Sequence, residues 1–169
     1  ASFHDSRRGT TQAFTVTNSA MPGSIKMSKG SNGHLWFAQS TTILRYDARQ
    51  WYTYTLPLEA NGSSVTALYA ARNGDLWAGI CCGNVAALRL RATTWTTYTQ
   101  QVAPGSDLYN VTSIAEDGSG ALWFGTYSGA FRFDGSTWSR YTSADGLYGD
   151  SVQQVAGDSQ GHVWFITTQ

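Results

Sequence analysis

Short runs in which apolar and polar side chains alternate dominate this chain, and clusters of turn residues separate them. Between residues 110 and 149 four such runs follow one another, at 111–115, 122–126, 130–133 and 138–142. A period of two with many β-branched and aromatic residues predicts β-strands. The intervening Asp117–Gly120, Ser128-Gly129 and Asp134-Gly135 segments are typical of tight turns. This part of the chain is therefore expected to form four short antiparallel strands.

The same unit recurs along the sequence. Four similar sequence segments contain Trp36, Trp77, Trp123 and Trp164, and consecutive tryptophans of this series are 41, 46 and 41 residues apart. The first complete unit predicts strands at 24–28, 35–39, 43–46 and 51–55, and the second at 64–68, 76–80, 85–90 and 95–99. Four short strands repeated at about 43 residues are typical of the blades of a β-propeller. The predicted fold is thus all-β, a propeller of four-stranded antiparallel blades.

A second tryptophan series supports this interpretation. Trp51, Trp95 and Trp138 each begin a W-x-x-Y-T motif in the fourth strand of a unit. The two series together contain all seven tryptophans, so we expect these side chains to pack between strands and blades. Small residues after the first aromatic pair, namely Ala38, Gly79 and Gly125, would let neighbouring blades approach closely.

The unit boundaries predict about four blade-equivalents in one propeller region. Residues 1–15 resemble the end of a blade, 24–63, 64–109 and 110–149 are full blades, and 151–169 begin another. Three interpretations stay open. Further blades belong to a longer chain, or the terminal strand pairs complement each other to close a four-bladed ring, or several copies close a larger ring as a homo-oligomer. An open array would expose apolar blade faces.

With both motifs placed, the sequence resembles the two-component regulator propeller repeat. Residues 111–152 carry that pattern as Val111, Ile114, Asp117, Gly120, Leu122–Thr126, Arg132–Gly135, Trp138, Tyr141-Thr142, Asp145–Leu147 and Val152. The unit at 64–109 departs from it, with Arg91-Ala92 in place of the Asp-Gly turn. The resemblance implies a bacterial sensor-type propeller, periplasmic or extracellular, that binds a small polar or carbohydrate ligand in signal transduction and is not an enzyme.

Composition narrows the function further. Eleven basic and eleven acidic residues cancel, and no Lys/Arg cluster suggests a nucleic-acid partner. No apolar run is long enough to span a bilayer, so direct membrane insertion is not expected. Scarce lysine with abundant Trp, Tyr, Thr, Ser and Gly suits an extracytoplasmic β protein. No motif calls for a cofactor.

Ligands of propellers usually bind near the axis, on the face of the loops that join the blades. The loops at 100–109 and 143–150 and the hairpin at 127–129 share that face in the predicted fold. Their aromatic and hydrogen-bonding side chains suit a sugar. We therefore take these as candidate ligand-binding residues: Asp107, Tyr109, Tyr127, Asp145, Tyr148 and Asp150. Asp, Tyr and Gly are also common in the loops of any propeller, and Asp145 belongs to the family repeat.

Cys81-Cys82 is the sharpest departure from the repeat, at a hairpin where the next unit has Tyr127-Ser128. Adjacent cysteines can form a vicinal disulfide in an oxidising compartment, or remain free thiols. Two cysteines without flanking histidines make a poor zinc site, and no metal is predicted.

Two other functions are the alternatives. The chain also resembles streptogramin lyases, propellers in which catalytic His and Glu side chains converge on one face. This chain has few such residues. His34 and His162 occupy one position of the repeat turn, where the other repeats have Asp75 and Ala121, so neither is expected to be catalytic. This leaves His4, Glu59 and Glu116. The other alternative is a scaffold for protein–protein interaction.

Overall fold

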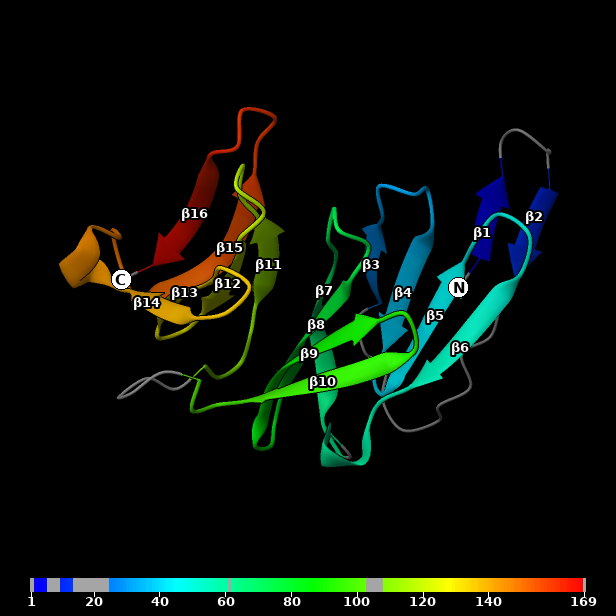
Figure 1. Cartoon of the computed structure of the whole chain (residues 1–169), viewed down its shortest axis with the longest axis horizontal. Coiled ribbons are helices and arrows are strands. Elements are labelled where there is room, and N and C mark those ends of the chain that lie inside the picture. Colours follow the sequence, from blue (N-terminus) through cyan, green and yellow to red (C-terminus); the bar gives the residue numbers. More distant parts are fainter. Residues whose placement is uncertain (1, 6–9, 14–24, 61, 103–107, 169) are drawn as a thin grey trace.

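Three four-stranded antiparallel sheets lie between two two-stranded ones in this chain (Figure 1). The computed structural model describes residues 2–5, 10–13, 25–60, 62–102 and 108–168. The complete sheets are β3 (Lys26–Lys29), β4 (Leu35–Gln39), β5 (Thr42–Tyr46) and β6 (Trp51–Thr55); β7 (Ser64–Ala70), β8 (Leu76–Cys81), β9 (Val85–Arg91) and β10 (Thr94–Thr99); and β11 (Ser113–Glu116), β12 (Leu122–Thr126), β13 (Gly129–Phe133) and β14 (Trp138–Tyr141). Each sheet keeps its strands in chain order, which is the topology of a propeller blade. The predicted all-β propeller fold is confirmed.

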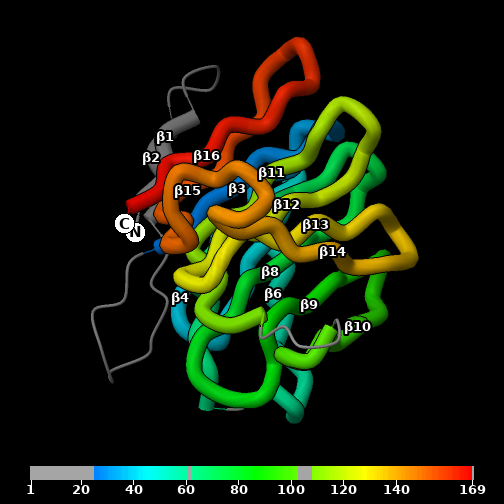
Figure 2. Tube along the Cα trace, turned by 90° about the vertical axis from the view of Figure 1, so that its left-hand side faces the viewer, coloured from blue at the N-terminus to red at the C-terminus, as the bar shows by residue number. Residues whose placement is uncertain are grey.

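The two-stranded sheets lie at the two ends of the array. They are β1 (Ser2–Asp5) with β2 (Thr10–Ala13), and β15 (Ser151–Gly157) with β16 (Val163–Thr168). Short 3₁₀ turns η1 (Leu58–Ala60) and η2 (Ser143–Asp145) occupy two of the connections between sheets. Figure 2 views the stack from the β15–β16 end, with the other blades behind.

The first strands of neighbouring blades lie against one another. β3 contacts β7, β7 contacts β11, and β11 contacts β15. Thr66 Oγ1 donates to the Val111 carbonyl at 2.6 Å, and Thr112 Oγ1 donates to the Val152 carbonyl at 2.8 Å. Each hydroxyl satisfies a carbonyl of the next blade, which fixes the spacing between blades along their inner strands.

Trp77 and Trp138 pack as expected, whereas Trp164 in β16 is 64% exposed. Trp77 is buried and stacks on Tyr98 of its own fourth strand, with ring centroids 5.2 Å apart, and meets Phe124 of the next blade at 5.5 Å. In the second series, Trp138 lies 4.9 Å from Phe124. These aromatic contacts within and between blades form the core of the chain.

Close approach of the blades depends on glycine in the second strands. A Cβ on Gly79 would lie 2.5 Å from Cγ1 of Val111, and one on Gly125 would lie 2.9 Å from Cγ1 of Val152. A valine of the following blade therefore fills the space that a side chain would need, which confirms the role predicted for these two glycines.

Among the described residues no helix is long or apolar enough to cross a membrane.

Candidate functional site

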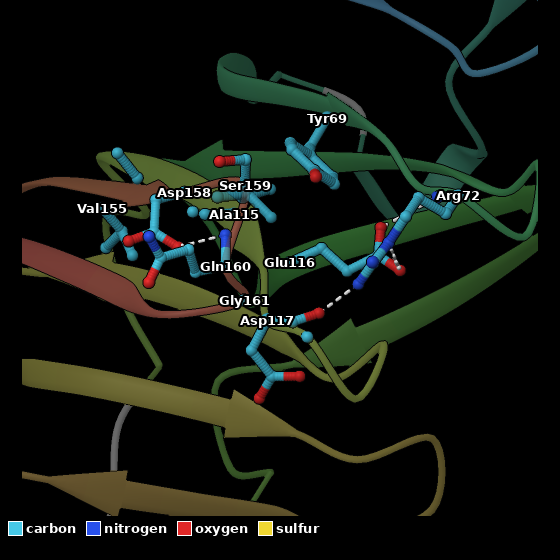
Figure 3. A pocket seen from close by; sticks show the side chains of 14 residues that line it. Tyr69, Arg72, Ala115, Glu116, Asp117, Val155, Asp158, Ser159, Gln160 and Gly161 are labelled. Atoms are coloured by element: carbon cyan, nitrogen blue, oxygen red, sulfur yellow. Dashed lines mark hydrogen bonds and ion pairs between the residues drawn. The ribbon is translucent and has the colours of Figure 1, made fainter.

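Two pockets lie at opposite ends of the first strands of the blades, which we call the inner strands. The first, which we call the turn pocket, is a cavity of about 550 Å³ where β7, β11 and β15 enter the turns to their second strands (Figure 3). The second, the hairpin pocket, is a cavity of about 480 Å³ at the other end of these strands. It is lined by Lys26, Thr66, Cys81, Cys82, Asn110, Val111, Thr112, Tyr127 and Gln153. Both cavities are of the size that holds a small molecule.

An ion pair between two blades forms one wall of the turn pocket. Glu116, at the end of β11, is buried, and its Oε1 lies 3.1 Å from Nε of Arg72. The backbone N–H of Arg72 donates to the other carboxylate oxygen at 2.8 Å, and its guanidinium donates to the Asp117 carbonyl. Figure 3 shows the Glu116 and Arg72 side chains in contact at one side of the lining residues. Each carboxylate oxygen keeps lone-pair capacity for a further donor.

Tyr69 adds an aromatic ring to the same pocket. It comes from β7 and is half-buried. Burial, followed by the nearby charge of Glu116, raises the pKa of its phenol. The hydroxyl therefore stays protonated at neutral pH, where it can donate a hydrogen bond. An aromatic face, a hydroxyl, a guanidinium and a carboxylate together can bind the apolar and polar faces of a small polyol.

These side chains are departures from the repeat. Tyr69 stands where the next two blades have Ala115 and Ala156. Glu116 likewise stands where its neighbours have Ala70 and Gly157. From the sequence, Glu116 was a candidate only for catalysis in the lyase alternative, and neither Tyr69 nor Arg72 was predicted as a site residue. Comparison of the first strands position by position was the signal that could have found them.

Asp117 has a structural task beside this pocket. Its carboxylate accepts hydrogen bonds from Trp123 Nε1 at 3.1 Å and from Arg132 Nε at 3.3 Å, besides backbone N–H groups of its own turn. Burial alone would raise its pKa, but hydrogen bonds from Ser119 and Trp123 outweigh burial and lower the pKa to about 2. The carboxylate is therefore ionised and holds the second and third strands to the turn.

The preceding blade lacks this carboxylate, since Ala71 stands in its place. There the buried Trp77 Nε1 and Arg89 Nε have no hydrogen-bond partner. The contrast shows that the aspartate of the Asp-x-x-Gly turn satisfies two donors of its own blade.

The predicted ligand residues are spread over the loop face. Tyr127 lines the hairpin pocket and is 57% exposed. Asp145 accepts hydrogen bonds from the backbone N–H and hydroxyl of Thr142, and Asp150 accepts one from the Ser143 N–H at 2.6 Å. That last bond is the main cause of the lowered pKa of Asp150. Both carboxylates thus order the 142–150 loop.

Among the described residues, Tyr109, Asp145, Tyr148 and Asp150 do not line either pocket. Tyr109 and Tyr148 are exposed on the surface, and Asp107 lies outside the described residues. The turn pocket and the hairpin face lie at opposite ends of the inner strands, so the structure offers a second candidate surface. A ligand-binding role for the six residues stays a prediction.

His34 and His162 lie in turns, whereas His4 lies in strand β1. His162 Nδ1 is 3.1 Å from Asp158 Oδ2, and the His34 backbone N–H donates to Asn32 within its own turn. Among the described residues no group of three or more His, Cys, Asp or Glu side chains could hold a metal ion.

Comparison with known proteins gives a family for one segment. A model of the two-component regulator propeller family matches residues 105–128, which confirms the resemblance at the repeat that carries Leu122 to Thr126. No curated protein is similar enough in sequence to match the chain.

Solved structures similar to the chain include lyases and extracellular sensor domains. A virginiamycin B lyase from Staphylococcus aureus is 19% identical with a TM-score of 0.71, over 98% of this chain and 55% of the lyase. The extracellular domain of a putative one-component system from B. thetaiotaomicron is 16% identical with a TM-score of 0.69, over 98% of this chain and 23% of that domain. The extracellular domain of a putative hybrid two-component system from the same organism is 16% identical with a TM-score of 0.62, over 83% of this chain and 20% of that domain. The chain spans about half of the lyase and about a fifth of the sensor domains, and these likenesses show the fold alone.

Proposed function

We propose that this chain is a non-enzymatic, ligand-binding part of an extracytoplasmic bacterial sensor propeller, and that the turn pocket holds a small polar or carbohydrate ligand. The observation that carries the proposal is the group of Tyr69, Arg72 and Glu116 in one cavity. All three depart from a repeat that otherwise serves packing. The match to the regulator propeller family and the likeness to extracellular sensor domains support the sensor role and the location.

The chemistry of the pocket favours a ligand with several hydroxyl groups. The Glu116 carboxylate accepts hydrogen bonds, while the Arg72 guanidinium and the Tyr69 hydroxyl donate them. A buried carboxylate paired with an exposed guanidinium leaves the cation free to turn toward a ligand. Arg72 is 56% exposed in its side chain, whereas Glu116 is 5% exposed.

The test is a binding screen with matched glutamate variants. Neutral and acidic mono- and oligosaccharides are tested by thermal shift and calorimetry against the wild type, Glu116→Gln and Glu59→Gln. These are the only glutamates of the chain, and Glu59 is exposed in η1, away from the pocket. We expect Glu116→Gln to weaken binding at least about tenfold and Glu59→Gln to leave it unchanged. Tyr69→Phe, which removes only the hydroxyl, should weaken binding without disturbing the fold.

A second experiment distinguishes a lyase from a non-enzymatic sensor. The likeness to virginiamycin B lyase favours this second function, and Glu116 is the one glutamate in the turn pocket. No histidine is among the described residues that line that pocket. Incubation with virginiamycin B followed by mass spectrometry should leave the antibiotic intact. Its cleavage, or equal sugar binding by the Glu116→Gln variant, would contradict the proposal.

A further inference from the structure

The hairpin between β8 and β9 carries two adjacent thiols at the hairpin pocket. Cys81 is half-buried, Cys82 is exposed, and both are free cysteines. Their Sγ atoms lie 2.7 Å apart. The chain contains no other cysteine, and the corresponding hairpin of the next blade has Tyr127-Ser128. The pair is thus a departure from the repeat, like the charged group in the turn pocket.

The hairpin is fixed from two sides, so the thiols are held in place. Cys82 has a φ of 65°, a left-handed conformation that is costly for a residue with a side chain. The buried Ser63 donates from Oγ to the Cys82 carbonyl at 2.6 Å, and the side-chain amide of Gln100 donates to the Gly83 carbonyl. These bonds hold the backbone on both sides of Cys82, and a site built on a fixed backbone loses less entropy when it binds.

We propose that Cys81 and Cys82 form a chelating site for a trivalent thiophile of the arsenite or mono-organoarsenical class. Thiol sulfur is a soft ligand. Trivalent arsenic is pyramidal and takes two sulfurs on the same side, close together, as this hairpin presents them. A linear two-coordinate ion would need its sulfurs on opposite sides. The remaining substituent of the arsenic is directed into the hairpin pocket, beside Lys26 and Tyr127.

The binding step needs no oxidant. An organoarsenic oxide reacts with the two thiols, two As–S bonds form, the As–O bonds break, and both thiol protons leave in one molecule of water. Burial, followed by the neighbouring Cys82, raises the pKa of the Cys81 thiol. The Cys81 thiol therefore meets the ligand protonated at neutral pH, and the departing oxygen carries its proton away in the water that forms. This site does not depend on the function proposed for the turn pocket.

Phenylarsine oxide is the probe for the test. The reduced chain is treated with one equivalent, and intact mass and thiol titration are recorded. We expect one phenylarsenic group per chain with loss of both titratable thiols. An excess of 2,3-dimercaptopropanol should reverse the reaction, and an excess of a monothiol should not.

Single substitutions decide whether chelation is involved. Cys82→Ser is the first variant, because Cys82 is exposed and Ser128 occupies the equivalent position in the next blade. Cys81→Ser is the second. Each should weaken retention at least about tenfold, because one As–S bond alone is readily hydrolysed. Retention by Cys82→Ser equal to that of the wild type would overturn the proposal. So would a reduced wild type that keeps both thiols titratable, or one that closes to a disulfide instead of taking the arsenical.

Discussion

At the scale of single residues, one aspartate shows how a turn supports a whole blade. Asp117 accepts hydrogen bonds from Trp123 and Arg132, and its side chain is only 14% exposed. Asp117→Asn removes the charge from these bonds, so the free energy of unfolding at neutral pH should fall by about 2 kcal/mol. Chemical denaturation measures the loss.

Asp158→Asn is the matched control, because Asp158 makes the same turn and the same bond to Trp164 in an exposed setting. A loss at least as large in Asp158→Asn would contradict this account.

The same aspartate predicts a pH dependence. The pKa of Asp117 is lowered from 3.8 to about 2, so its ionised form contributes stability above the ordinary pKa. That contribution is lost as the pH falls through the lowered value. The stability difference between wild type and Asp117→Asn should therefore be constant near neutral pH and shrink between about pH 4 and pH 2. Denaturation curves at several pH values measure it, and a difference that grows on acidification would have the wrong sign.

At the scale of elements, the blade interface depends on a glycine facing a valine. A Cβ on Gly79 would lie 2.5 Å from Cγ1 and 2.6 Å from Cβ of Val111. Gly79→Ala should force the blades apart and reduce the free energy of unfolding by about 1–3 kcal/mol. Val111→Ala removes the closer of these two atoms, Cγ1, but keeps Cβ, and by itself it leaves a cavity, since Val111 is fully buried.

The double variant provides the control. Gly79→Ala with Val111→Ala should be less destabilised than the sum of the two single variants, because the loss of Cγ1 removes one of the two close contacts and the new methyl group fills part of the cavity. Thermal and chemical denaturation of all four proteins measure this coupling. Strict additivity would mean that the two residues do not determine the distance between blades.

The strands were the predictable part of this structure, because each repeats a pattern set by its own residues. The expected strands at 35–39, 51–55 and 122–126 coincide with β4, β6 and β12. The first strand of the third full blade begins at Ser113, later than its β-branched pattern suggested. There Asn110 adopts a positive φ, and Thr112 uses its hydroxyl to bond the next blade. Contacts between blades therefore moved a boundary that alternation alone placed earlier.

The turn pocket was harder to predict, because it exists only between blades. Arg72 and Glu116 are 44 residues apart, and neither belongs to a local motif. Alternation and turn chemistry describe one blade at a time, so they led instead to the loops, where Asp145 and Asp150 order the backbone. The Arg72–Glu116 pair can be identified from the sequence only by aligning the repeats and comparing the residues at equivalent positions.

At the scale of the whole molecule, the outer face of β16 is uncovered. Trp164 and Ile166 are 64% and 59% exposed, whereas the equivalent Trp77 is 1% exposed beneath the next blade. Contiguous exposed apolar side chains favour association.

We expect these 169 residues to self-associate, and Ile166→Ser to shift the equilibrium toward the monomer without a large change in stability. Native mass spectrometry and light scattering measure the shift. Leu58→Ser is the control, because Leu58 is 86% exposed in η1, away from β16. A wild type that stays monomeric, or equal association by Ile166→Ser, would contradict this role of the face.

The residue at that position also limits what can cover β16. Ile166 stands where the two preceding blades have Gly79 and Gly125, the glycines that receive a valine of the following blade. A sheet that packed on β16 in the same way would bring its valine into the isoleucine side chain. Whatever covers this face, whether another blade or a second copy, must therefore present a small residue opposite Ile166. In that case Ile166→Gly should weaken the contact by leaving a cavity, whereas in the two preceding blades it is the glycine that permits the contact.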